Sequence, residues 1–106
     1  MRKITLRPAV PGEEARWLFW DHHLPRERFR ELTETGRALW ICGGEEKAGL
    51  LRWGYFWDEI PFLNLIWLHE SCRGEGAGRA AMALWEDSLR KAGCRAAMTS
   101  TQADEG

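Results

Sequence analysis

Apolar and polar residues alternate at the start of the chain and then follow a helical spacing. Residues 4–7 alternate and are followed by Pro8, which has no N–H to donate to a strand ladder, so this segment predicts a short first strand. Pro11 then opens a segment with acidic residues in its first turn. Its apolar residues keep a helical spacing as far as about Trp20, which predicts a helix.

A second helix and a pair of strands are expected next. The helix should begin at Pro25 and end before Gly36, because proline suits the first turn of a helix and glycine the residue after the last turn. Residues 38–42 are apolar and typical of a strand. The polar, glycine-containing residues 43–47 predict a turn into another strand over residues 48–56, and the two strands should form an antiparallel hairpin.

The second half of the chain predicts a buried strand, a long helix and a last strand. Residues 62–68 are almost continuously apolar, as in a central strand covered on both faces. Residues 76–92 carry one stripe of apolar and small side chains and end in a basic turn before Gly93, the clearest helical pattern in the chain. Residues 95–100 should form a strand parallel to residues 62–68, because a crossover helix separates the two.

This order of elements predicts an α/β fold with a mixed, mostly antiparallel central sheet and helices on both faces. A chain of 106 residues holds one domain, which we expect to span residues 1–106. Hydrophobic residues make up 44% and charged residues 29%, as in globular proteins, which argues against a disordered chain.

Charge and cysteine content exclude several classes of function. Fifteen basic and 16 acidic residues give a net charge of -1, far from the basic balance that nucleic-acid binding requires. No apolar run approaches the roughly 20 residues of a membrane span, so we expect a cytoplasmic protein that binds no membrane. Three cysteines without a C-x-x-C pair indicate neither a disulfide framework nor a structural metal site.

The seven tryptophans are unusual for this length. They can be explained by packing, since aromatic side chains bury large areas. The functional alternative is the wall of a small-molecule pocket made of four aromatic residues, Trp53, Tyr55, Trp57 and Trp67. With Asp58 and Glu59 nearby, such a pocket would favour an amine on an apolar or ring-bearing molecule.

The strongest chemical signal is the segment Arg73-Gly74-Glu75-Gly76-Ala77-Gly78-Arg79 between the buried strand and the long helix. Its alternate glycines let the backbone approach a ligand, and the helix start directs N–H groups at the same place, which favours a phosphate. A tight turn that needs glycine only for steric reasons is the alternative. A Walker loop is excluded because no lysine follows, and a dinucleotide fingerprint lacks the acidic residue expected where Thr99 and Ser100 stand.

These residues resemble the GCN5-related N-acetyltransferases. The motif of that family is Arg or Gln, two residues, Gly, one residue, then Gly or Ala, here Arg73, Gly76 and Gly78. The preceding apolar strand, the following helix and the order of elements from Ile4 onward are also similar. The resemblance implies acetyl-CoA as co-substrate and direct transfer of its acetyl group to a primary amine, here of an unidentified small-molecule acceptor.

The resemblance also implies roles for individual residues. The family's motif loop holds the pyrophosphate of acetyl-CoA, and the strand before it pairs with pantetheine. Those roles fall here on ten cofactor-binding residues: Trp67, Leu68, His69, Arg73, Gly74, Glu75, Gly76, Ala77, Gly78 and Arg79. A backbone N–H near Leu68 would polarise the thioester carbonyl.

The chain also departs from the family pattern. Members continue past the fifth strand into another helix and a hairpin, and a tyrosine on that helix commonly donates a proton to the leaving thiolate. We therefore expect this chain to be a form shortened at its C-terminus. Some members carry a glutamate base on the fourth strand, where this chain has Asn64. We expect Asn64 and Glu59 to be catalytic, and Asp58 and His69 are further candidates for the base. The alternative function is a non-catalytic acyl-CoA-binding or interaction module, and a homodimer stays open.

Overall fold

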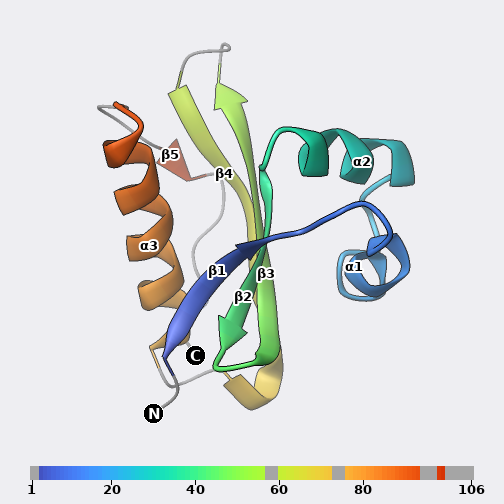
Figure 1. The fold of residues 1–106 in the computed structure, drawn as a ribbon, viewed down its shortest axis with the longest axis horizontal. Coiled ribbons are helices and arrows are strands. Elements are labelled where there is room, and N and C mark those ends of the chain that lie inside the picture. Colours follow the sequence, from blue (N-terminus) through green and yellow to red (C-terminus); the bar gives the residue numbers. More distant parts are fainter. Residues whose placement is uncertain (1–2, 57–59, 73–75, 94–97, 100–106) are drawn as a thin grey trace.

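A central sheet with helices on both of its faces forms the fold in a computed structural model that describes residues 3–56, 60–72, 76–93 and 98–99 (Figure 1). Helices α1 and α2 lie on one face of the sheet and α3 on the other. The elements are β1 (Ile4–Pro8), α1 (Glu14–Trp20), α2 (Arg26–Glu34), β2 (Ala38–Gly43), β3 (Glu46–Phe56), β4 (Ile60–Leu68), the 3-10 turn η1 (Glu70–Cys72), α3 (Ala77–Lys91) and β5 (Met98–Thr99).

The sheet has the order β1-β2-β3-β4-β5. The first four strands pair antiparallel, and β5 pairs parallel to β4 through Phe62 with Met98 and Leu63 with Thr99. The predicted fold class, the hairpin and the parallel last strand are confirmed. Residues 95–97 and 100 of the predicted last strand lie outside the described residues.

Two apolar cores lie on the two faces of the sheet. The core under α1 and α2 is built around Trp17, whose ring lies 5.4 Å from that of Phe29 and 5.0 Å from that of Trp40. The core under α3 joins the buried stripe of that helix, including Ala81 and Trp85, to the other face of the strands. The apolar stripe of each helix is thus buried against one face of the sheet.

A bulge at Asn64 changes which face of the sheet each side chain of β4 joins. Arg52 of β3 pairs with Leu65 but the next residue, Trp53, pairs with Leu63, so Asn64 is the extra residue. As a result Leu63 packs in the core under α3, whereas Leu65 packs against the core under α1 and α2. A strict alternation would have placed both on one face.

The bulge also separates aromatic residues that the sequence suggested as one pocket. Trp53 packs under α3, 6.1 Å from the ring of Trp85, whereas Trp67 packs on the face of α1. Trp53 and Trp67 therefore cannot line a common pocket on one face of the sheet. Trp57 lies outside the described residues, and the rings of Tyr55 and Trp53 lie 5.3 Å apart.

Strand β4 is covered less evenly than its apolar sequence predicts. Its side chains on the face of α3, such as Ile66 and Leu68, are buried, whereas Leu65 and Trp67 on the face of α1 are only half-buried. The continuous apolar run therefore marks one fully covered face and one partly exposed face.

Close packing between β3 and β4 depends on Gly49. A second bulge leaves Ala48 without a partner between Cys42–Lys47 and Ile41–Gly49 of the hairpin. There Gly49 lies so near β4 that a Cβ would overlap the carbonyl oxygen of Trp67. Only glycine fits this position.

One ion pair ties α1 to the sheet from inside the core. Asp21, 5% exposed, accepts hydrogen bonds from Arg52 Nε at 2.8 Å and from Trp17 Nε1 at 3.1 Å through the same oxygen. It follows the last residue of α1 and so fixes the end of that helix over β3. None of the described helices is long and apolar enough to cross a membrane.

Candidate functional site

The outer edge of β4 carries backbone groups that point away from β3. The N–H of His69 donates to the carbonyl oxygen of Ala48 at 2.8 Å, so at this position the backbone faces β3. Alternate residues of an antiparallel strand face opposite edges. The N–H groups of Ile66 and Leu68 therefore face the outer edge, on the side of β5.

The pairing of β4 with β5 is described at two positions of this edge. Among the described residues the parallel ladder ends at Leu63 and Thr99, and none of β5 pairs with β4 beyond it. The bulge at Asn64 comes directly after that ladder, where the strand bends. The segment from the bulge to Leu68 continues the same edge of β4 beyond the described part of this ladder.

Helix α3 begins beside the end of β4. Its N-cap, Gly76, has the left-handed φ of 75° that favours glycine, and its carbonyl oxygen accepts the first helical hydrogen bond from Ala80. Ala77 and Gly78 are buried and Arg79 is exposed. Because the first N–H groups of a helix have no partner within it, this end of α3 favours an anion.

An aromatic wall stands on the face of α1 next to this edge. The ring of Trp20 lies 4.7 Å from that of Trp67 and 6.0 Å from that of His69, and it also contacts Trp40 at 6.2 Å. Trp40 and Trp67 both pair with Leu50, so they lie in one row across the sheet. Trp20 thus connects β2 with the end of β4.

Beside this wall, the carboxylate of Glu13 is held by several donors. One oxygen accepts from Trp40 Nε1 at 3.0 Å and from the N–H of Val10 at 2.9 Å, and the other accepts from Arg7 at 3.0 Å, with Lys47 Nζ at 3.8 Å. Burial alone would raise the pKa of Glu13. The hydrogen bonds and the charge of Arg7 outweigh burial and lower this pKa from 4.5 to about 2.

The structure brings some of the residues predicted from sequence together and leaves others undescribed. Asn64 is exposed at the bulge, and its Oδ1 would lie 3.1 Å from a Cβ on Gly54. Of the predicted strand residues only Leu68 directs its N–H to the outer edge, whereas Trp67 and His69 face β3 with theirs. Residues 73–75 and Glu59 lie outside the described residues.

Two residues of this region were missed by the sequence reasoning. Ile66 directs its N–H to the same edge as Leu68, and it lies nearer the bulge. Trp20 forms the centre of the aromatic wall although it is the last residue of α1. The period-two spacing from Leu68 could have indicated Ile66, whereas no local signal indicates what Trp20 contacts.

Metal binding has no visible support in the part of the chain that the structure describes, where no three His, Cys, Asp or Glu side chains come together. Cys42 is buried and Cys72 is half-buried.

Comparisons with known proteins give a consistent fold. The comparison with curated proteins found no match. Among solved structures, an integron cassette protein from the Cole Harbour Salt Marsh metagenome has a TM-score of 0.69 at 21% identity, covering 91% of this chain and 76% of its own. An acetyltransferase from Thermus thermophilus has 0.60 at 23% identity, covering 85% and 73%. An aminoglycoside N-acetyltransferase solved with CoA has 0.62 at 17% identity, covering 96% and 79%.

At such identities the likeness shows the fold alone. The sequence profile of the acetyltransferase (GNAT) family, however, matches residues 8–105, nearly the whole chain. The match includes the strand, the glycine loop and the helix on which the site was built. The chain belongs to the GNAT family of acetyltransferases.

Proposed function

We propose that this protein transfers the acetyl group of acetyl-CoA directly to a primary amine of a small-molecule acceptor. Family membership supports acyl transfer from acetyl-CoA in general. The observation that carries the proposal is that two features lie next to each other. These are the backbone groups of β4 that face its outer edge past the bulge, and the N-terminus of α3.

The residues present fit the coenzyme. A Cβ on Gly76 would meet nothing within 4 Å, so the backbone at the start of α3 is open to an approaching pyrophosphate. The N–H groups of Ala77 and Gly78 and the side chain of Arg79 would hold that group. Along β4, the backbone of Ile66 and Leu68 would pair with the amides of pantetheine as an added strand does.

Bound acetyl-CoA supplies an acetyl group activated as a thioester. The protein's part begins with the N–H of Leu68 or Ile66, which would donate to the thioester carbonyl and stabilise the negative charge that develops on it. As the amine nitrogen would form its bond to the carbonyl carbon, the C–S bond would break and its electron pair would leave on the thiolate of coenzyme A, while one proton would leave the nitrogen. We assign its acceptance to Glu59, with Asn64 orienting the amine.

The test measures coenzyme binding by calorimetry and turnover by release of free thiol over a panel of amines. Gly78→Asp places bulk and negative charge at the helix start and should weaken CoA binding at least tenfold. Arg79→Gln should weaken it about threefold. Arg90→Gln, the same change on an exposed arginine at the other end of α3, is the matched control and should leave binding unchanged.

Each outcome bears on the proposal. Unchanged CoA affinity in a folded Gly78→Asp variant would show that the glycine loop is only a steric turn. If that variant does not fold, Arg79→Gln decides, because Arg79 is exposed and its replacement spares the core. Coenzyme binding without thiol release for any amine would refute catalysis and favour an acyl-CoA-binding module.

A further inference from the structure

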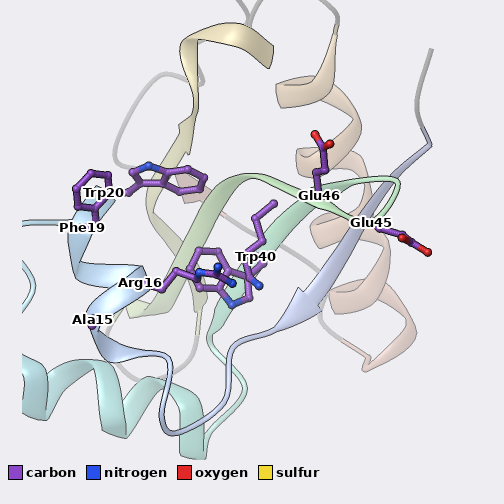
Figure 2. A pocket seen from close by; sticks show the side chains of 8 residues that line it. Ala15, Arg16, Phe19, Trp20, Trp40, Glu45 and Glu46 are labelled. Atoms are coloured by element: carbon purple, nitrogen blue, oxygen red, sulfur yellow. The ribbon is translucent and has the colours of Figure 1, made fainter.

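A pocket lies between α1 and the turn of the β2–β3 hairpin (Figure 2). It has a volume of about 790 Å³, within the range of small-molecule sites. Aromatic side chains form much of its wall: Trp40 is fully buried, Trp20 is half-buried and Phe19, at 72% exposed, stands at the rim. An exposed phenylalanine beside a hollow has apolar surface to offer to a ligand.

The charged groups of this pocket are arranged unequally. Arg16 extends from α1 toward Trp40, whereas the carboxylates of Glu45 and Glu46 point away from that ring (Figure 2). Lys47 Nζ lies 5.0 Å from the centre of the Trp40 ring. Both cationic groups therefore lie on the side of Trp40, and the two acidic residues lie at the exposed turn of the hairpin.

The carboxylate nearest to these cations is already engaged. Glu13 accepts hydrogen bonds from Arg7, Val10 and Trp40, and Lys47 is only its most distant partner at 3.8 Å. Within the described part of the chain, no carboxylate pairs with Arg16. The guanidinium of Arg16 can therefore pair with a negative group brought by a ligand.

We propose that this pocket binds a small molecule with a flat apolar body and a carboxylate. The apolar body would lie against Phe19 and the half-buried indole of Trp20, and the carboxylate would accept hydrogen bonds from Arg16 and Lys47. Planar guanidinium groups match carboxylates in geometry. None of the residues that line this pocket is among the ten predicted coenzyme-binding residues, so binding of a carboxylate here does not depend on the proposed transfer reaction.

A cationic ligand fits the same pocket less well. The face of Trp40 that would attract an ammonium group already has Lys47 over it, and Arg16 would repel a second positive charge. The acidic residues of the hairpin turn point away from the ring and are exposed, so water screens their attraction. The arrangement thus selects for a negative group.

The test uses two probes that share a phenylethyl group and carry opposite charges, 3-phenylpropionate and phenethylamine, titrated into the whole chain by calorimetry without coenzyme. We expect 3-phenylpropionate to bind and phenethylamine to bind at least tenfold more weakly. Arg16→Gln should weaken 3-phenylpropionate binding about fivefold, since one charge-assisted contact at an exposed site is lost. Phe19→Ala should weaken it about threefold. Both side chains are exposed, so the fold should survive.

The matched control is Arg26→Gln, an exposed arginine at the start of α2 outside the pocket, which should leave the affinity unchanged. Tighter binding of phenethylamine, or an unchanged affinity in folded Arg16→Gln, would overturn the proposal. The carboxylate could belong to the acetyl acceptor or to a separate molecule, and phenylalanine with acetyl-CoA tells these apart. Acetylation of phenylalanine that Arg16→Gln slows identifies the acceptor, and binding without acetylation identifies a separate ligand.

Discussion

Replacing Glu13 with glutamine tests how the N-terminus of α1 is held to the sheet. The change keeps the shape of the side chain but removes the charge and turns one acceptor oxygen into a donor. That group then faces other donors, because Arg7, Lys47, Trp40 and the N–H of Val10 all approach the carboxylate. Hydrogen bonds to a charged group contribute more than those between neutral groups, so glutamine cannot replace them fully.

The magnitude follows from the lowered pKa. A fall from 4.5 to about 2 corresponds to about 3 kcal/mol at 1.36 kcal/mol per unit. Because the side chain of Arg7 is 45% exposed, water screens part of this interaction, and we expect Glu13→Gln to lower the free energy of unfolding by about 2 kcal/mol at pH 7. Urea unfolding followed by tryptophan fluorescence measures the difference.

The pH dependence separates the charge from the shape. A carboxylate whose pKa is lower in the folded state stabilises the fold fully above its unfolded pKa of 4.5 and loses this effect as pH falls toward 2. The advantage of the native chain over Glu13→Gln should therefore shrink by about 1–2 kcal/mol between pH 7 and pH 3. Glu27→Gln, an exposed acidic residue in the first turn of α2, should cost below about 0.5 kcal/mol. A difference between native chain and Glu13→Gln that stays constant over this range would refute the reasoning.

Two further predictions concern packing and the buried ion pair. Gly49→Ala should lower the free energy of unfolding by about 3 kcal/mol or more, because its Cβ would overlap the backbone of β4. The Cβ of Gly44→Ala would meet nothing, so this control should cost about 1 kcal/mol for its left-handed φ of 66°. Equal urea midpoints for the two variants would contradict this. Asp21→Ala should lower the free energy of unfolding by about 3 kcal/mol, because it leaves the donors of Trp17 and Arg52 without their acceptor. Arg28→Ala, which breaks an exposed ion pair, should cost less than about 0.5 kcal/mol. Thermal unfolding compares the two variants, and a small effect of Asp21→Ala would show that water replaces the carboxylate.

The order and type of the elements follow from local sequence signals. Alternation before Pro8, helical spacing after Pro25 and the stripe of α3 gave elements within a few residues of those observed. The antiparallel hairpin and the parallel last strand followed from the turn residues and from the crossover helix. These signals suffice because propensity, period and capping act over a few neighbouring residues.

The faces of β4 were decided only by the tertiary structure. Asn64 is the one polar residue in the otherwise apolar run of residues 62–68, but its polarity alone does not show that it is the extra residue of a bulge. That bulge arises from the register with β3, and it sends Trp53 and Trp67 to opposite faces. A pocket inferred from nearness in sequence was therefore wrong, because side-chain direction depends on pairing across strands.

The candidate site divides in the same way. The glycine at the start of α3 could be inferred from sequence because a helix start is a local feature, whereas the role of Leu68 was implied by the family resemblance and stays a prediction. The Glu13 network, the contact of Trp20 with Trp67 and the pocket over Trp40 join α1 to strands that follow it by 20 or more residues in sequence. Such contacts depend on how α1 packs across the sheet, and only the three-dimensional structure determines that packing.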